Sequence, residues 1–425
     1  MRILIATDAF PPVCGGSGWS TYELARGLRQ RGHHLVIVQP RREGTPTPVV
    51  YDGFEVVGFP APAPPVPFVR NYVRNERLYK RLARFLERLV VHERIDIVHG
   101  QHLLTAPPAV RAARAARVPC VCTVRDYWPV CYWGDLTKDA GAGGLCPRCT
   151  PLNMTACVKP HTGSAWPLAI PWIPYMRANL AMKRRDLEGA DVIVAVSRRM
   201  VADLKDRAPE LDSTRIEAIP NAVDVARVRQ IAEGSPRPLR EPYALFVGKL
   251  ASNKGATALV DVAARARLDM PLVVIGDGPE RAVLAEAAAR ASLDLRILGW
   301  LDRDVVFQWM RHACLMIFPS GWQEPLSRVL IEASAIGVPV AAMDTGGTQD
   351  IVVHKVTGLL SQSIGELAAD VARLASDDAL RARLGAAAAG HAERQFDVPV
   401  VLDRMEQLYS DTIAGFRSRG ETGAG

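Results

Sequence analysis

Short apolar runs alternate with longer amphipathic stretches along the whole chain. RILIA at 2–6 and HLVIV at 34–38 are typical of short buried strands, and an amphipathic helix over 19–32, ended by Gly32, separates them. Similar apolar runs follow at 93–100, 118–124 and 190–196. Short buried strands joined by helices form βαβ units, so the first half predicts a parallel sheet.

The same rhythm restarts in the second half. Strand-like runs at 243–248, 271–279, 295–300, 315–320 and 338–343 alternate with helical stretches at 253–266, 281–291, 304–313 and 325–337. A proline-containing boundary near 225–242 separates the two arrays. The pattern predicts an α/β protein with two Rossmann-like, doubly wound domains, 1–225 and 226–399. Their cleft would lie at the carboxyl ends of both sheets.

Length and composition agree with this organisation. At 425 residues the chain is too long for one ordinary core, and 48% hydrophobic with 23% charged residues is typical of a soluble globular protein. Segments 43–68 and 128–174 are rich in Pro, Gly and Cys, and we expect them to leave the first sheet. No signal peptide is evident, and the apolar stretch 167–176 is too short to span a bilayer. A cytoplasmic protein is therefore expected.

Charge is distributed unevenly along the chain. Residues 1–189 carry 25 Lys and Arg against 14 Asp and Glu, whereas the remainder carries 27 against 31. A basic half suits nucleic acid, an anionic membrane or phosphorylated ligands. The sequence holds no zinc-finger helix, basic zipper or aromatic RNA platform, so we do not expect nucleic acid as a partner.

A basic amphipathic helix is the strongest charge feature of the first half. It combines Arg70, Arg74, Arg77, Lys80, Arg81, Arg84 and Arg88 with Leu78, Leu82, Phe85, Leu86 and Leu89. Such a helix could lie against anionic lipid headgroups, which would make the protein peripheral at the inner face of a membrane. An ordinary core stripe with a solvated outer face fits the pattern equally well.

Eight cysteines divide into isolated and clustered positions. Cys120 and Cys122 fall within a strand-like run, and Cys14 and Cys314 stand alone. The clustered thiols are Cys131, Cys146, Cys149 and Cys157, with a C-x-x-C at the centre. Four thiolates could hold a structural zinc, although the spacing differs from that of a standard finger, and free reduced thiols are the alternative.

The segment 319–347 contains the most specific chemistry. Glu324 follows a strand, and Glu332 lies eight residues further on, inside the next helix, which corresponds to a rise of about 12 Å. Ionised carboxylates at both ends would accept strong hydrogen bonds from hydroxyl groups. The helix N-terminal amides of Leu326, Ser327 and Arg328 would point between them and could receive phosphate or sugar oxygens.

Two lysines accompany these carboxylates. Lys249 and Lys254 lie between a strand and the start of a helix, which is a suitable position for binding a diphosphate. Cations there would also stabilise the charge that develops on a departing diphosphate. Gly276 and Gly278 in VVIGDGP match a tight turn after the next strand.

VGKLASNKG, VVIGDGP, LGWL, FPSGWQEPLSRVLIE and VAAMDTGG occur here in the order found in retaining glycosyltransferases of family 4, which have the GT-B fold. The loop DAFPPVCGGSG and the segment IPNAVD fit as well, so the chain resembles this family over nearly its whole length. The resemblance implies that the C-terminal helix, about 400–425, packs back onto the first domain.

The resemblance also implies residue roles. Glu324 would contact the hydroxyls of the transferred sugar, and Glu332 the ribose of a nucleoside diphosphate sugar (NDP-sugar) of the UDP or GDP type. Lys249 and Lys254 would bind its diphosphate, and Gly15 and Gly16 would let the backbone approach the diphosphate or the acceptor. Gly299, Trp300 and Leu301 would lie beside the base.

One position departs from the family pattern. Many relatives have a His-Asp pair where this chain has Arg125 and Asp126. Arginine cannot act as a base near neutral pH, but it can donate hydrogen bonds to a sugar or a phosphate. Either the acceptor differs, or turnover is slow or absent. His99 and His102, at the end of the preceding strand, could line the acceptor side of the same cleft, or they could be polar packing residues.

The reaction implied is transfer of a sugar, with retention, to a glycan or lipid-linked acceptor in cell-surface polysaccharide or glycoconjugate synthesis. No Asp-x-Asp motif is placed to hold a diphosphate, so we expect metal-independent catalysis without a required cofactor. An epimerase or phosphorylase would share the architecture, but no lysine context suggests a pyridoxal site. A non-catalytic sugar-nucleotide-binding subunit of a glycosylation complex is the alternative from another class.

Overall fold

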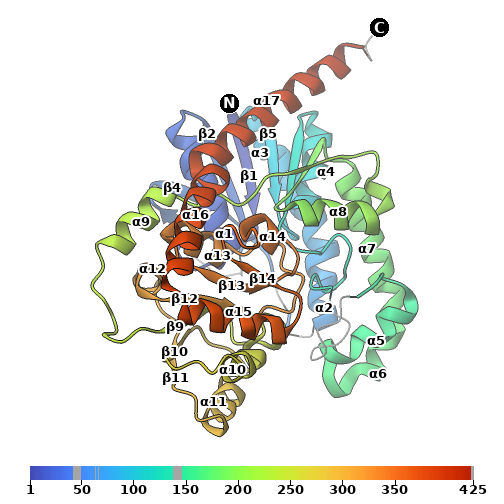
Figure 1. Ribbon diagram of the computed structural model, residues 1–425. Coiled ribbons are helices and arrows are strands. Elements are labelled where there is room, and N and C mark those ends of the chain that lie inside the picture. Colours follow the sequence, from blue (N-terminus) through green and yellow to red (C-terminus); the bar gives the residue numbers. More distant parts are fainter. Residues whose placement is uncertain (42–48, 63, 66, 137–145, 423–425) are drawn as a thin grey trace.

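The computed structural model describes residues 1–41, 49–62, 64–65, 67–136 and 146–422, which contain two parallel sheets flanked by helices (Figure 1). The first has the order β3-β4-β2-β1-β5-β6-β7-β8, in which only β3 and β4 pair antiparallel. Its strands are β1 (Arg2–Thr7), β2 (His34–Arg41), β3 (Val49–Tyr51), β4 (Phe54–Pro60), β5 (Ile97–Gln101), β6 (Cys120–Val124), β7 (Val192–Ala195) and β8 (Arg215–Ala218).

Helices cover both faces of this sheet, so β5, β6 and β7 are buried along their whole length. The helices are α1 (Gly16–Gln30), α2 (Pro67–Tyr72), the π-helical η1 (Val73–Leu78), α3 (Tyr79–His92), α4 (Ala106–Ala116), α5 (Pro151–Thr162), α6 (Trp166–Ala169), α7 (Ile173–Glu188) and α8 (Arg198–Arg207). Short 3-10 turns occur at η2 (Gly163–Ala165), η3 (Ile170–Trp172) and η4 (Pro209–Leu211).

The second sheet has the order β11-β10-β9-β12-β13-β14 and is parallel throughout. Its strands are β9 (Ala244–Val247), β10 (Leu272–Ile275), β11 (Leu295–Gly299), β12 (Leu315–Phe318), β13 (Val340–Met343) and β14 (Leu359–Ser361). The helices around it are α9 (Val225–Glu233), η5 (Ser252–Lys254), α10 (Ala256–Arg265), α11 (Arg281–Arg290), α12 (Arg303–His312), α13 (Arg328–Ile336), α14 (Thr348–Ile351), α15 (Ile364–Ser376) and α16 (Asp378–Phe396). The α/β fold with two Rossmann-like halves is confirmed.

The expectation that 43–68 leaves the first sheet was wrong for part of this segment. β4 pairs with β2 in parallel register, Val56 opposite Ile37, and β3 pairs with β4. Phe54, Val56 and Phe59 are buried, so the segment packs on the core despite its prolines. Residues 42–48 lie outside the described part. The other segment, 128–174, contains no strand among its described residues and consists of α5, α6 and their connections.

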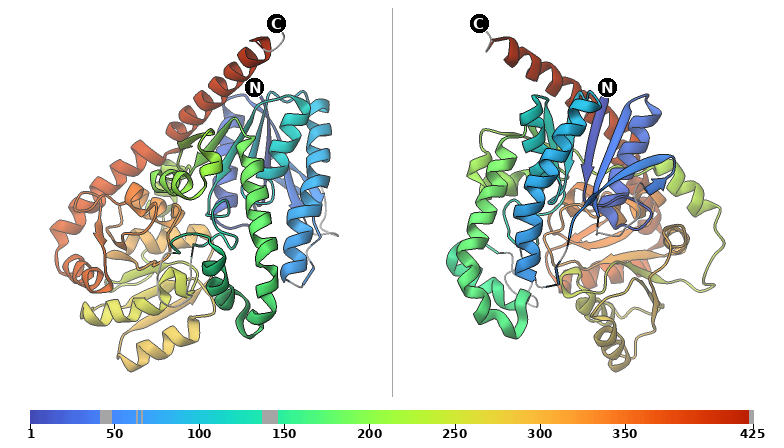
Figure 2. Two further views of the ribbon diagram at one scale, coloured as in Figure 1. Left: turned by 90° about the vertical axis from the view of Figure 1, so that its right-hand side faces the viewer. Right: turned by 180° about the vertical axis from the view of Figure 1, so that it is seen from behind.

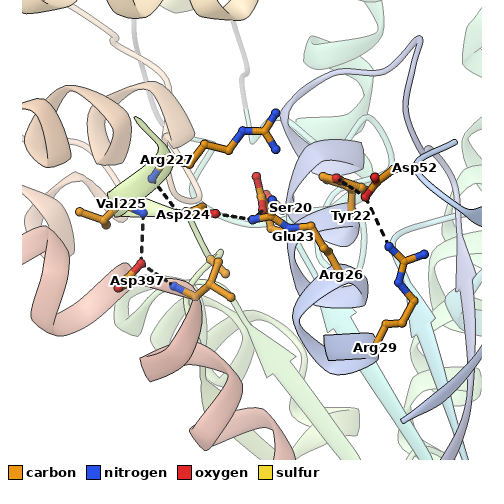
Figure 3. Close-up of polar contacts among 12 residues, drawn as sticks. Ser20, Tyr22, Glu23, Arg26, Arg29, Asp52, Asp224, Val225, Arg227 and Asp397 are labelled. Atoms are coloured by element: carbon orange, nitrogen blue, oxygen red, sulfur yellow. Dashed lines mark hydrogen bonds and ion pairs between the residues drawn. The ribbon is translucent and has the colours of Figure 1, made fainter. Parts of the chain in front are cut away.

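The chain crosses between the two halves twice, and the crossings lie side by side. Val223 and Asp397 form a parallel bridge, and the Val223 N–H donates to the Phe396 carbonyl at 2.9 Å. Asp397 accepts from the Val225 N–H at the start of α9, and Asp224 caps the same helix while accepting from Arg26 of α1 (Figure 3). Two adjacent segments, each fixed by a carboxylate, therefore form the hinge.

The last helix, α17 (Val398–Thr422), returns to the first half and packs across α1 (Figure 1). Its apolar side chains share one core with β1: Val401, Leu402, Met405, Leu408 and Tyr409 are all buried. It begins two residues before the expected start at 400, and 423–425 lie outside the described part. Within the described chain, every helix is too short or too polar to cross a bilayer.

A buried hydrogen bond fixes α17 to the sheet. The Tyr409 hydroxyl lies 2.6 Å from Nδ1 of His99, whose Nε2 lies 2.7 Å from the Thr123 hydroxyl. His99 is fully buried, and desolvation, together with the nearby Arg125 charge, lowers its pKa to about 3. The His99 imidazole is therefore neutral in the folded protein at neutral pH.

The buried histidine predicts loss of stability on acidification. Between pH 6.5 and about 3 the unfolded chain binds a proton at His99 that the folded chain does not, so the free energy of unfolding falls as pH falls through this window. His99→Gln removes this contribution, so its loss of stability between pH 7 and 5 should be about 2 kcal/mol smaller than in the wild type. Urea unfolding followed by circular dichroism at both pH values measures the difference. His92→Gln, at an exposed position on α3, is the control, and an identical pH dependence in all three proteins would contradict the assignment.

Candidate active site

A cavity of about 470 Å³ lies between the two halves, at the carboxyl ends of strands from both sheets. Its lining residues come from the loop between β1 and α1, from the loops after β9, β10 and β11, and from α12 and α13. They are Pro12, Cys14, Gly15, Gly16, Trp19, Val247, Gly248, Lys249, Ile275, Gly276, Trp300, Leu301, Asp302, Arg303, Val306, Arg328, Val329 and Glu332. Its size is typical of a small-molecule site.

The N-terminus of α1 faces this cavity through two glycines. Gly15 is the N-cap and provides no side-chain acceptor for the first-turn N–H groups of the helix. Gly15 and Gly16 both line the cavity, and neither has a side chain of its own to cover its backbone. The positive end of the α1 dipole can therefore reach an anion bound there.

Opposite this helix end, Glu332 lies between two arginines. Its Oε1 is 2.9 Å from Arg328 Nε and 3.0 Å from Arg303 Nη2, and its side chain is 9% exposed. Arg328 is equally buried, and it continues into the first half, where its Nη1 donates to the Ala222 carbonyl at 3.0 Å. Desolvation lowers the pKa of this guanidinium, and the adjacent Glu332 charge opposes the shift.

Glu23 extends this network into α1. Its Oε2 lies 2.8 Å from Arg26, and its Oε1 lies 3.7 Å from Arg328 and 3.6 Å from Arg303. The Glu23 side chain is 1% exposed, so water does not compensate its charge. Residues of α1, α12 and α13 thus form one buried ionic network across the interface, and the cavity lies beside it.

The lysine and carboxylate predicted to act on the donor lie together. Lys254 Nζ is 2.6 Å from Glu324 Oε2, and the same ammonium lies 4.3 Å from the centre of the Trp322 ring. Glu324 is buried, and its loop is held by the turn after β13: the Gly347 N–H donates to the Glu324 carbonyl, and Gly346 has a positive φ of 55°. A Cβ on Gly346 would lie 2.1 Å from that carbonyl, so the turn requires glycine.

Further predicted residues lie at this interdomain cavity. Lys249 and Gly276 line it at the ends of β9 and β10, and Gly276 has a φ of 137°, at which a Cβ would collide with the Gly248 carbonyl. Trp300 is 78% exposed at the rim beside Leu301, after Gly299 at the end of β11. An exposed indole at this place can stack on a planar ring.

Leu326 and Ser327 contribute only through the backbone. The Leu326 side chain packs into the core, and Ser327 is the buried N-cap of α13, which begins at Arg328. Their side chains do not line the cavity, so any contact with a ligand would come from peptide N–H groups at this helix start.

Asp126 and His102 meet on the other side of the cleft, after β6 and β5. His102 Nε2 lies 3.4 Å from Asp126 Oδ2, and both side chains are partly exposed. Among the described residues, Nδ1 of His102 has no hydrogen-bond partner although it is buried, and its backbone has a φ of 78°. A histidine in the left-handed region stores strain, which is typical of functional positions.

Arg125 and His99 have other hydrogen-bond partners than this pair. Arg125 donates from Nε to Asn221 at 3.0 Å, and burial lowers its pKa to about 10, so it stays charged at neutral pH. It borders a small internal cavity of about 20 Å³ with Thr123 and Met405. His99, predicted on the acceptor side, is instead fully buried under α17, where both ring nitrogens are bonded.

The four clustered cysteines line one cavity of about 10 Å³ below Tyr132 and Trp133. Burial raises the pKa of Cys149 to about 11 and that of Cys157 to about 12, and neighbouring thiols add to both shifts. In the described part of the chain, no three His, Cys, Asp or Glu residues have an arrangement that could hold a metal ion. Zinc binding by Cys131, Cys146, Cys149 and Cys157 stays a prediction.

Sequence reasoning missed three residues of the site. Glu23 and Arg303 belong to the buried network, and Trp322 contacts Lys254. A glutamate among apolar helix positions in STYELA was the available signal for Glu23. Arg303 gave none, because one arginine at a helix start is common on protein surfaces.

Profiles of known protein families match both halves of the chain. A profile described as Glycosyltransferase Family 4 matches residues 14–227, and one described as Glycosyl transferases group 1 matches 228–391. Among curated relatives, alpha-maltose-1-phosphate synthase of Mycolicibacterium smegmatis is 27% identical over 85% of this chain and 84% of its own. Glycogen synthase of Mycobacterium tuberculosis is 26% identical over 98% and 96%.

Solved structures show the same fold. Sucrose-phosphate synthase from Thermosynechococcus elongatus has a TM-score of 0.70 at 20% identity, covering 98% of this chain and all of its own. Anabaena HepE, solved in complex with UDP-glucose, has a TM-score of 0.62 at 20% identity, covering 97% and all of its own.

The buried network predicts that Glu23 controls domain closure. In Glu23→Ala the guanidinium groups of Arg328 and Arg303 lose one carboxylate, and breaking a buried ion pair costs about 3 kcal/mol or more. We expect a lower melting temperature and a larger radius of gyration in small-angle X-ray scattering. Glu55→Ala, exposed on β4, is the control. Unchanged scattering and melting in Glu23→Ala would show that the network does not hold the halves together.

Proposed function

Because this chain belongs to glycosyltransferase family 4, we propose that it is a retaining enzyme that moves a sugar from an NDP-sugar to a hydroxyl group. The donor is of the UDP or GDP type, and the acceptor is a glycan or a lipid-linked glycan. The observation that carries this proposal is the interdomain cavity, where the α1 N-terminus and Lys249 face buried Glu332. In an NDP-sugar the diphosphate follows the ribose. A helix N-terminus and a lysine suit the diphosphate, and a carboxylate opposite them suits the ribose hydroxyls.

The donor would lie along the cleft from Trp300 to Glu324. Its base stacks on Trp300, its ribose hydroxyls bond Glu332, and its diphosphate lies between the α1 N-terminus and the two lysines, Lys249 and Lys254. Its sugar then reaches Glu324, which exchanges part of its pairing with Lys254 for sugar hydroxyls. HepE, which shares the fold, was solved with UDP-glucose, and this supports a UDP donor.

The transfer step needs no protein nucleophile in this proposal. The bond from the anomeric carbon to the diphosphate oxygen breaks, and the acceptor oxygen bonds the same carbon on the same face. The acceptor proton passes to the leaving phosphate oxygen. Lys249, Lys254 and the α1 dipole stabilise the negative charge on that phosphate, so catalysis would be independent of a metal ion.

On the acceptor side, His102 and Asp126 would orient the attacking hydroxyl. Both are partly exposed in the cleft, and Asp126 is fixed by accepting the Trp128 N–H at 2.9 Å. Lys183 is buried nearby; desolvation lowers its pKa to about 8, while the Asp126 charge opposes the shift. The role in cell-surface polysaccharide synthesis is part of the proposal.

One observation favours a second candidate, a non-catalytic sugar-nucleotide-binding subunit. Arg125 stands where many relatives have a histidine, and its Nε donates to Asn221. Such a subunit would bind the nucleotide and never release it from a sugar, so product formation separates the two candidates.

The first prediction from this proposed function concerns the sugar donor. Incubation with UDP-, GDP-, ADP- and dTDP-sugars should release one nucleotide, with EDTA having no effect. Lys254→Met and Glu324→Gln should each lower its release by about 100-fold, because each removes a charge-assisted contact to the reacting part of the donor and leaves its partner without a counter-ion.

Lys205→Met, exposed on α8, is the matched control and should keep full activity. Binding of one nucleotide without release, in the presence of candidate acceptors, would favour the binding subunit. Trapping of a covalent glycosyl-enzyme would contradict the nucleophile-free step.

The second prediction concerns the acceptor. His102→Asn and Asp126→Asn should reduce transfer about tenfold or more, the value of a lost hydrogen bond to a charged group. The dissociation constant for the nucleotide, measured by calorimetry, should stay within about twofold of the wild type because the donor cavity excludes both residues. A loss of nucleotide affinity equal to the loss of transfer would place this pair on the donor instead.

A further inference from the structure

One end of the first half, opposite the free end of α17, is built from helices (Figures 1 and 2). There α2, α5, α6 and the start of α7 lie together. Leu168 is 78% exposed, Trp172 and Tyr72 are each 43% exposed, and Val69 and Ile170 are also exposed. We call these five residues the apolar ridge.

The ridge is continuous although its residues come from two segments. The ring of Tyr175 lies 6.2 Å from Tyr72 on α2 and 6.2 Å from Trp172 on η3. Asn71 also donates to the Tyr132 hydroxyl at 3.1 Å, which fixes α2 against the segment that follows β6. The exposed residues of the ridge therefore lie on a packed layer that includes Asn71, Tyr132 and Tyr175.

Basic side chains prevail around the ridge, although the partly buried carboxylate of Glu76 lies close to Tyr175. Residues 140–185 contain no Asp or Glu and six Lys or Arg, among which Lys159 and Arg177 are exposed. On the helix next to it, Arg77 lies 6.0 Å from the Tyr72 ring, and exposed Lys80 follows one turn later. Apolar and aromatic side chains inside a basic margin are what an anionic membrane surface binds.

We infer that the apolar ridge docks on an anionic lipid bilayer, with its aromatic side chains among the headgroups and its basic margin on the lipid phosphates. Tyr72 and Trp172 have the amphipathic rings that favour the membrane interface, and prolines at 167, 171 and 174 keep the apolar side chains on short turns at the surface. The basic margin favours a bilayer over a second copy, since two such margins would repel each other.

The packed layer under the ridge is connected to the cleft by a series of side-chain contacts. His161 of α5 bonds Asp135 at 2.9 Å and stacks on Trp133, and the Asp135 carbonyl accepts from the indole of Trp322. Burial alone would lower the pKa of His161, but its bonds to Asp135 and the Cys157 carbonyl outweigh burial and raise it. Trp322 in turn lies beneath Lys254.

A docked bilayer would therefore lie beside the mouth of the cleft, and a lipid-linked acceptor could present its polar end there while its lipid stays in the membrane. This last step rests on the proposed transferase function; the docking itself does not.

Flotation of the full chain with vesicles tests the docking without any sugar donor. The wild type should bind vesicles of phosphatidylcholine with phosphatidylglycerol at least tenfold more strongly than phosphatidylcholine alone, and salt should weaken the binding. L168E/W172E should lose about tenfold or more of this binding. V353E/V356E, at two exposed valines of the second half, should bind as the wild type does.

Circular dichroism, measured on every variant, shows that each is folded and keeps this test separate from the proposed function. Vesicle binding that L168E/W172E retains, or that is equal on the two lipid compositions, would overturn the inference. So would a wild-type dimer in size-exclusion chromatography that L168E/W172E converts to monomer, because the ridge would then be covered by a second copy.

Discussion

The burial of Glu332 between two arginines is the constraint on which the cleft depends. An isolated carboxylate at 9% exposure would be strongly destabilised, and Arg328 and Arg303 make the position tolerable. Arg328 also reaches Glu23 and the backbone of the first half. The group proposed to recognise the ribose is therefore part of the contact that brings the two halves together. The proposed donor recognition and the contact between the halves share one set of charges.

The parallel sheets explain why so much chemistry lies in one place. The loops after β1, β5 and β6 come from one sheet and those after β9 to β12 from the other, and all end on the cleft. The segment after β6 is the longest of these excursions. It contributes Asp126, the cysteine cavity and part of the apolar ridge, and it touches Trp322 of the opposite half. One insertion thus connects Asp126, the loop of Trp322 and an exposed surface.

Much of the fold and of the candidate site could be predicted from the sequence. The apolar runs predicted most strands because strands buried on both faces need no polar alternation. They missed β3 and β4, which lie in a proline-rich segment, and also β8 and β14, which have four and three residues. At the site, Lys249, Glu332 and the glycines fell around one cavity because strand ends fix their positions. His99 and Arg125 could not be placed from sequence. Their direction depends on α17 and on Asn221, which lie far away in the chain.

The return of α17 to the first sheet also affects how the protein is made. The core around β1 includes Leu402 and Tyr409, so the first half of the chain cannot complete its packing until synthesis has passed Tyr409. During translation the uncovered face of α1 and the edge of that core stay exposed to solvent and to chaperones. A chain that stops before α17 would have a complete second half and an unfinished first half. Quality control that recognises the uncovered face of α1 would therefore detect chains that lack this helix.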